Sequence, residues 1–100
     1  MTNQPTSVQL NPARHRFELD TDGKLSIVEY RRIDERTLAL THTEVHPDLE
    51  GQGIGSRLVN GVLEYVAQHD LTIVPYCPFI QTYLKRHPDW NRVVSDRFEV

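Results

Sequence analysis

The chain has 100 residues, 38% of them hydrophobic, which is enough apolar material for one small core and one domain. Its formal net charge of -3 leaves no basic excess, so we expect no nucleic-acid partner. The apolar run over residues 71–74 is far too short to span a bilayer, so we expect no membrane partner either.

The N-terminal segment comes first in chain order. Residues 1–12 are polar and include Pro5 and Pro12, so we expect a frayed, flexible arm in front of a single domain over residues 13–100. This start lacks the basic-then-apolar pattern of a secretory signal. The single cysteine excludes an internal disulfide. We therefore expect a cytoplasmic protein, monomeric or weakly dimeric because so small a domain has little stability to spare.

Three strands are predicted next. Polar and apolar residues alternate over residues 16–20 and 25–32, and the sequence Asp20-Thr21-Asp22-Gly23 between them predicts a hairpin turn. A second turn at Asp34-Glu35 leads to a third strand over residues 37–45. Because tight turns join these strands, we expect them to be antiparallel.

The segment from Glu50 to Arg57 is the most informative part of the chain. It carries three glycines at alternate positions, and a helix over about residues 55–69 begins at once. Glycine lets a backbone approach a ligand closely, and a helix start adds unpaired N–H groups and a partial positive charge. The segment therefore predicts an anion site, most often one for phosphate.

The second half of the chain alternates helices with one strand. The helix after the glycines has an apolar stripe that faces a core: Ile54, Leu58, Val59, Val62, Leu63, Val66 and Ala67. Residues 71–74 predict a short buried strand, parallel to the third because a helix joins them. A second helix is predicted over residues 78–87, with these residues on its apolar side: Phe79, Ile80, Tyr83, Leu84 and His87. We expect the tail to fold back on the core through Trp90, Val93, Val94 and Phe98.

Three kinds of glycine loop bind phosphate at a helix start. A Walker P-loop needs Gly-Lys-Ser/Thr, whereas Gly55 is followed by Ser56-Arg57. A dinucleotide fingerprint needs its third glycine one residue later, after the first strand of a larger sheet. The remaining candidate is the pyrophosphate loop of acyl-CoA enzymes.

The glycine segment resembles motif A of the GNAT acetyltransferase superfamily, Gln/Arg-x-x-Gly-x-Gly/Ala, with Gly53 and Gly55 at the two small positions. Flanking blocks extend the resemblance to a small single-domain GNAT-like subgroup over about residues 14–90. These blocks are His42–Val45, Pro75–Ile80, Tyr83 and His87-Pro88. The resemblance implies a compact α/β (α+β) fold. Its central sheet is mostly antiparallel, with one parallel, splayed pair of strands and two main helices.

The resemblance also implies that acetyl-CoA or coenzyme A is bound, with pantetheine hydrogen-bonded to the backbone near Glu44 and Val45. The residues expected to bind this cofactor are Val45, Gly51, Gln52, Gly53, Ile54, Gly55, Ser56 and Arg57. Glu50 departs from the family pattern, which has Gln or Arg at its position. The backbone N–H groups must then do most of the binding, with a possible side-chain contact from Arg57.

Four residues are candidates for catalysis. His42 and Glu44 lie on one face of the third strand, and a histidine suits a general base because it titrates near neutrality. The alternative is a structural histidine. Cys77 precedes Pro78, so it is expected to cap the second helix, and a helix N-terminus favours the thiolate. It either accepts the acetyl group, lines the pocket or is a small buried hydrophobe. Tyr83 is either the acid for the leaving thiolate or a core residue.

The main hypothesis is an acetyl-CoA-dependent N-acetyltransferase that acts on a small-molecule or protein amine. A non-catalytic CoA-binding or interaction module is the alternative, and a nucleotide-binding protein is the third possibility. No metal site is expected, because the four histidines outside the third strand lack metal-ligand spacing: His15, His46, His69 and His87.

Overall fold

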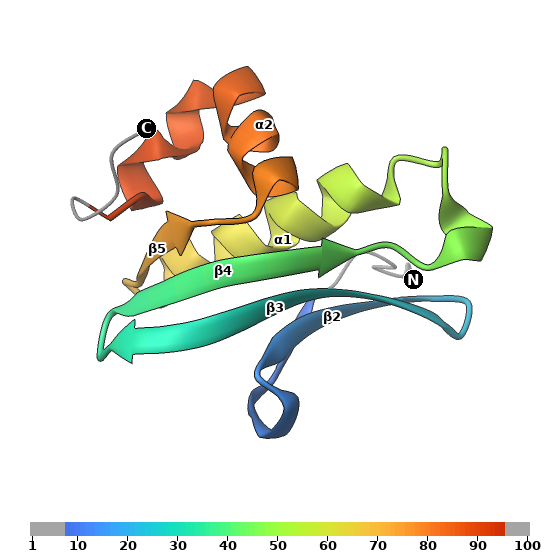
Figure 1. Ribbon diagram of the computed structural model, residues 1–100, viewed down its shortest axis with the longest axis horizontal. Helices are drawn as coiled ribbons and strands as arrows, with labels where there is room; N and C mark the ends of the chain where they lie inside the picture. The colour runs from blue at the N-terminus through green and yellow to red at the C-terminus, as the bar shows by residue number, and fades with distance from the viewer. Residues whose placement is uncertain (1–7, 96–100) are drawn as a thin grey trace.

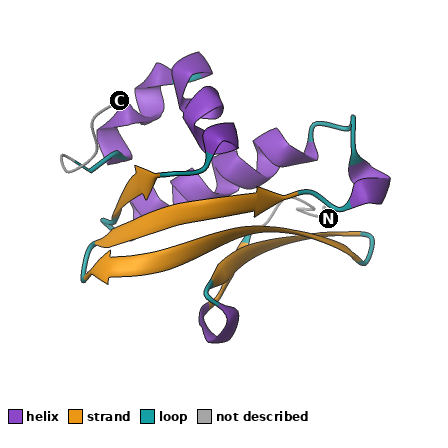
Figure 2. Ribbon diagram, in the orientation of Figure 1, coloured by secondary structure: helices purple, strands orange, loops and turns teal. Residues whose placement is uncertain are grey.

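The computed structural model describes residues 8–95, which form one five-stranded sheet with two α-helices (Figures 1 and 2). The strands are β1 Gln9–Asn11, β2 Arg16–Thr21, β3 Lys24–Asp34, β4 Thr37–Glu44 and β5 Thr72–Pro75, and they lie in this order across the sheet. The helices are α1 Ile54–Gln68 and α2 Pro78–Arg86. Three short 3-10 helices complete the chain: η1 Pro12–Arg14, η2 Pro47–Leu49 and η3 Pro88–Val93.

The sheet is antiparallel from β1 to β4, and β4 pairs with β5 in parallel. The expected mixed fold with one parallel pair is therefore confirmed. The hairpin between β2 and β3 has a two-residue turn, in which Asp22 and Gly23 have φ of 54° and 84°. Positive φ at both positions is the type I′ geometry that matches the twist of the flanking strands. The N–H of Gly23 also donates to Oδ1 of Asp20 at 2.7 Å.

The structure differs from the sequence expectation at residues 9–11, which were predicted to be part of an irregular arm. They form β1, in which Leu10 lies opposite Phe17 and is half-buried. The amide of Asn11 donates to the carboxylate of Glu18 at 2.9 Å and fixes the end of this strand. A three-residue strand is too short for alternation to reveal it. The first seven residues of the predicted arm lie outside the described part of the chain.

β4 and β5 run together for only four residue pairs, from Thr37↔Thr72 to Leu40↔Pro75. β5 then ends, and the N–H groups of Tyr76 and Cys77 both donate to the Leu40 carbonyl, at 3.0 and 3.1 Å. β4 continues to Glu44 alongside β3 alone. The two chain segments therefore part after Leu40, which leaves the end of β4 without a paired strand on its β5 side among the described residues.

The core lies between one face of the sheet and the two helices. α1 crosses behind the sheet in Figure 1 and buries six residues of its predicted stripe: Ile54, Leu58, Val59, Val62, Leu63 and Val66. From the sheet, Phe17, Leu19, Val28, Leu38, Leu40 and Ile73 face them. The predicted folding back of the tail is confirmed for Val93, which is buried, and for Trp90 and Val94, which pack against the core. Phe98 lies outside the described residues.

The apolar side of α2 is narrower than predicted. Ile80 and Leu84 are buried and Tyr83 is half-buried, but Phe79 is 44% exposed and His87 is exposed. Ile80 and Leu84 are four residues apart and so lie one above the other on the core side. Phe79 points away from this line, toward the start of α1, where its ring lies against Gly55.

Candidate functional site

The connection between β4 and α1 is a structured loop. The N–H of His46 donates to Oγ of Ser26 on β3 at 3.1 Å, and Ser26 is fully buried. The His46 ring nitrogen Nδ1 in turn accepts the N–H of Asp48 at 3.1 Å and so caps η2. Leu49 is buried in the core. These contacts fix where the chain enters the glycine segment.

The three glycines of this segment are required for two different reasons. Gly51 and Gly53 have φ of 83° and 75°, which L side chains rarely adopt, although a Cβ at either position would meet open space. At Gly55, φ is not positive, but a Cβ would lie 2.7 Å from Cζ of Phe79. Two glycines thus serve the turn, and the third makes room for a neighbouring ring.

The start of α1 presents backbone donors. Gly53 is the N-cap residue, no side chain caps the helix, and its first turn carries no acidic residue. The N–H of Arg57 donates to the Gly53 carbonyl at 3.2 Å, which is the first turn of helical bonding. Within the described part of the chain, the N–H groups of Ile54, Gly55 and Ser56 precede this bond and donate to no backbone carbonyl. Such donors and the helix dipole suit an anion.

The side chains around the start of α1 leave its backbone N–H groups accessible to an anion. Ile54 is buried and anchors the first turn in the core. Gln52 is exposed and its amide donates to the Asp48 carbonyl at 3.4 Å. Ser56 and Arg57 are exposed in the first turn of α1. Glu50 is also exposed, so its charge is surrounded by solvent.

Cys77 lies where β4 and β5 part. It is the N-cap residue of α2, as predicted, but its side chain does not bond to the helix backbone. The thiol is 6% exposed and donates to Oγ1 of Thr43 on β4 at 3.4 Å. Val45 comes two residues after Thr43, directly after the end of β4, and is half-buried between the core and Gly55. Cys77, Thr43 and Val45 therefore line the helix side of the opening between the strands.

His42 and Glu44 lie together but on the other face of the sheet. Nε2 of His42 is 3.5 Å from Oε1 of Glu44, and both side chains are more than half exposed. His42 is opposite Glu29 on β3, whereas Thr43 is opposite the fully buried Val28. Residues paired across a ladder share a face. The predicted general base His42 and its neighbour Glu44 therefore lie on one face of the sheet, and Cys77 lies on the other.

Tyr83 is held on the α1 side of α2. Its hydroxyl donates to Oδ1 of Asn60 at 3.3 Å, and its ring stacks on His87 with centroids 4.2 Å apart. Burial, and secondly the charge of Glu64, raises the pKa of Tyr83 above its usual value, so the phenol stays protonated. Tyr83 is six positions after Cys77, which corresponds to about 9 Å along the helix axis. The structure does not bring these two side chains together.

Comparison with known proteins defines the family. The GCN5-related N-acetyltransferase family matches this chain over residues 16–93, which is most of its length. The chain belongs to the GCN5-related N-acetyltransferases. Protein NATD1 of Gallus gallus is 30% identical over 86 residues, which are 84% of this chain and 78% of that protein. Protein NATD1 of Homo sapiens is also 30% identical over 86 residues, covering 84% and 76%.

A solved structure agrees with the family fold. The NMR solution structure of a GCN5-like protein from Staphylococcus aureus superimposes with a TM-score of 0.68 and covers 93% of this chain and 91% of that one. At 24% sequence identity, this likeness concerns the fold alone. The family and the fold predicted from the glycine segment are therefore both confirmed.

Sequence reasoning gave no site role to three residues that lie at or beside the candidate site. Thr43 contacts the Cys77 thiol, Ser26 fixes the loop before the glycines, and Phe79 covers Gly55. The alternation of β4 was a signal for Thr43, because it places this residue on the face opposite His42 and Glu44. No local pattern indicated Ser26 or Phe79, since each acts on a residue at least 20 positions away.

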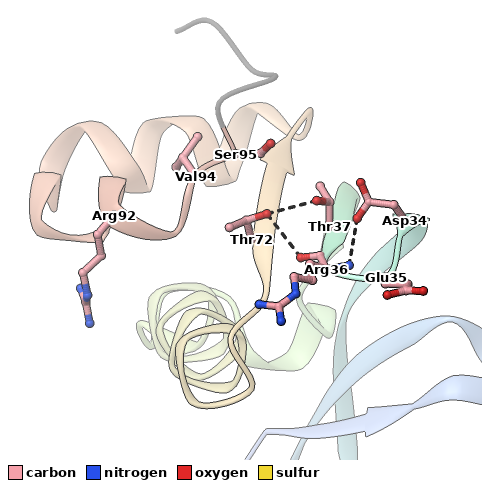
Figure 3. A pocket seen from close by; sticks show the side chains of 8 residues that line it. All are labelled: Asp34, Glu35, Arg36, Thr37, Thr72, Arg92, Val94 and Ser95. Atoms are coloured by element: carbon pink, nitrogen blue, oxygen red, sulfur yellow. Dashed lines mark hydrogen bonds between the residues drawn. The ribbon is translucent and has the colours of Figure 1, made fainter.

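A separate cavity of about 780 Å³ lies at the other end of β4. Its walls include Arg36, Thr37, Thr72 and Ser95 (Figure 3). The Thr37 and Thr72 hydroxyls bond to each other at 3.2 Å, and the Arg92 side chain points away from them. The glycine segment, which is the candidate functional site, is at the opposite end of the strand from this cavity. Among residues 8–95 no group of side chains suits a metal ion, and no helix is long and apolar enough to cross a membrane.

Proposed function

We propose that the chain is an acetyl-CoA-dependent N-acetyltransferase. The observation that carries this proposal is the start of α1, which has no side-chain cap and follows a glycine turn at the end of β4, in a chain of the acetyltransferase family. The bound donor supplies an activated acetyl thioester. The other steps depend on what the side chains and backbone of this chain do.

The donor's pyrophosphate is held by the N–H groups at the start of α1. Ile54, Gly55 and Ser56 offer these donors, while Gly51, Gln52 and Gly53 shape the turn in front of them. Arg57 adds a positive charge at the same helix end. The backbone of Val45 and Glu44, beyond the last residue pair with β5, aligns the thioester arm between the strands.

The acceptor amine approaches from the open face of the sheet, where His42 and Glu44 lie. The nitrogen of the amine bonds to the acetyl carbon while His42 takes a proton from that nitrogen. Glu44 stabilises the imidazolium that forms. The carbon–sulfur bond breaks, and the thiolate receives a proton. Tyr83 is the acid proposed for this step, and to act its hydroxyl must leave Asn60 and turn toward the thiolate. The acceptor is a small-molecule amine or a protein amine, and the chain acts in the cytoplasm as a monomer or weak homodimer.

Cys77 lines the acetyl pocket, and we propose direct transfer to the amine rather than passage through its thiol. Its sulfur is buried and already bonded to Thr43, so it is not presented as a free nucleophile. Cys77→Ala should keep CoA binding within about twofold and keep turnover. A tenfold or larger loss of turnover, or a mass increase of one acetyl group on Cys77 after incubation with acetyl-CoA, would establish the covalent route.

Calorimetric titration with acetyl-CoA tests the central proposal. Saturable binding at or below millimolar concentration is expected, and absence of binding there would refute it. Release of free thiol is then measured with a panel of small amines and lysine peptides. ATP is the control ligand, because a general nucleotide-binding protein would bind ATP as well as CoA.

One observation favours a second function, that of a non-catalytic CoA-binding module. The candidate catalytic groups do not meet, since His42 and Glu44 are on one face of the sheet and Cys77 is on the other. A module of this kind binds acetyl-CoA but releases no thiol with any amine in the panel. Turnover with one amine would exclude it.

A further inference from the structure

Phe79 is an exposed aromatic residue that lies against the donor loop. It occupies the first turn of α2, directly after Pro78, and 44% of it is exposed. Two atoms of its ring, Cζ and Cε2, lie 2.7 and 3.2 Å from the point where a Cβ on Gly55 would be. Cγ2 of Val45 lies 3.4 Å from that same point. The Phe79 ring thus lies where the end of β4, the start of α1 and the start of α2 meet.

This place lies on the path that a donor must take. Under the proposed function, the pyrophosphate is held by the N–H groups around Gly55, at the uncapped start of α1, and the acetyl group lies near Thr43 and Cys77, which are in contact with each other. Val45 follows Thr43 by two residues on the same side of the strand, a distance of about 7 Å. A thioester that extends from the helix start to Cys77 therefore passes Gly55 and Val45, where the Phe79 ring now lies.

We propose that Phe79 is a gate, whose ring fills the space beside Gly55 in the free protein and swings out when a pyrophosphate-bearing thioester binds. This inference rests on the proposed function, because it assumes that the donor binds at this loop. The ring is suited to move because nearly half of it already faces solvent, and its neighbours Ile80 and Leu84 hold α2 in the core independently of it. The absence of a side chain at Gly55 leaves room for the ring in the closed state, since a methyl group there would collide with it.

The first test uses NMR on the wild-type protein with coenzyme A as the probe. In the free protein, nuclear Overhauser effects should connect the Phe79 ring to the Gly55 α-protons and to the Val45 methyl groups. At saturating coenzyme A these contacts should disappear while those between Phe17 and Tyr30 remain. If the contacts from Phe79 persist in the saturated complex, the ring does not swing and the gate is refuted.

The second test compares affinities. Phe79→Ala removes the closed state, so the Kd for coenzyme A should fall about three- to tenfold, because no binding free energy is used to open the gate. Ile33→Ala removes a side chain of similar exposure (41%) far along β3, and should leave Kd unchanged. An unchanged or weakened affinity in Phe79→Ala would overturn the gate. Phe79→Leu replaces this variant if Phe79→Ala does not fold.

The outcomes separate the gate from the proposed function. If the wild-type protein binds coenzyme A but Phe79→Ala binds no better, only the gate fails. If neither protein binds at millimolar concentration, the proposed function fails and the gate with it. If Phe79→Ala binds and the wild-type protein does not, both proposals are supported.

Discussion

At the scale of single residues, Gly53 and Gly55 should respond differently to the same substitution. Gly53→Ala forces a side chain into the left-handed region, which costs about 1–2 kcal/mol of the free energy of unfolding. Gly55→Ala gains about 1 kcal/mol of helix propensity, which offsets a similar cost of pushing the Phe79 ring aside. Urea unfolding of both variants checks this. A larger loss of stability in Gly55→Ala than in Gly53→Ala would contradict it.

A second residue-scale prediction concerns the Tyr83 hydroxyl. Tyr83→Phe removes one partly buried hydrogen bond to Asn60, so it should cost about 1 kcal/mol of stability. If the phenol is the acid for the leaving thiolate, turnover should fall at least about tenfold. Asn60→Ala is the control, because it removes the same hydrogen bond and keeps the phenol. Equal losses of turnover in both variants would mean that Tyr83 only holds α1 and α2 together.

The raised pKa of Tyr83 also makes the stability of the protein depend on pH. Burial favours the neutral phenol in the folded state, so its contribution to stability is complete below the unfolded pKa of about 10 and is lost as pH rises through the higher folded value. Activity that depends on the phenol as an acid should therefore persist through mildly alkaline pH.

At the scale of elements, the sequence predicted what depends on local patterns. The turn at Asp22-Gly23, the apolar stripe of α1 and the N-cap position of Cys77 each follow from residues a few positions apart. The register of the sheet could not be predicted from such local patterns. Thr41 is skipped in the register, because Glu29 pairs with His42 and Tyr30 with Leu40, and its hydroxyl donates to the Glu29 carbonyl at 3.3 Å. Such a bulge depends on contacts between strands, and so does the placement of His42 on the face opposite Cys77.

A cluster of polar side chains on β1 and β2 makes the stability of the protein depend on pH. The Arg16 guanidinium donates to the Glu18 carboxylate at 2.8 Å, and the Asn11 amide donates to the same oxygen. These hydrogen bonds, that from Arg16 first, lower the pKa of Glu18 below its ordinary value. The folded carboxyl therefore binds its proton less readily than the unfolded one. Its contribution to stability is present above the unfolded pKa of about 4.3 and is lost as pH falls through the folded value.

Glu18→Gln should accordingly lower the stability of the protein at pH 7 by up to about 1 kcal/mol, the range for a partly exposed pair. Near pH 3 the difference from the wild-type protein should shrink toward zero. Thermal unfolding at both pH values measures this, with Glu35→Gln in the exposed turn after β3 as the control. A deficit in Glu18→Gln that is as large at pH 3 as at pH 7 would show that packing of the side chain, not its charge, is responsible.

At the scale of the whole molecule, the sheet separates two sets of functional groups. The helix side carries the start of α1, Val45, Thr43 and Cys77, whereas the open side carries His42 and Glu44. Between these two sides, among the described residues, β4 runs on beyond the end of its pairing with β5. Under the proposed function, the donor would enter from the helix side and the acceptor from the opposite side, so the two substrates would not compete for one entrance.

This arrangement predicts that variants on the two faces have separate effects. His42→Ala should lower kcat at least about tenfold while the Kd for acetyl-CoA changes less than twofold, because a base on the open face does not touch the donor's pyrophosphate. Gly53→Ala should do the reverse and weaken acetyl-CoA binding through the displaced N–H groups of α1. Calorimetry and thiol release on the same protein samples measure both effects. If His42→Ala weakened acetyl-CoA binding as much as Gly53→Ala does, the two faces would not be separate sites, and His42 would belong to the donor's own pocket.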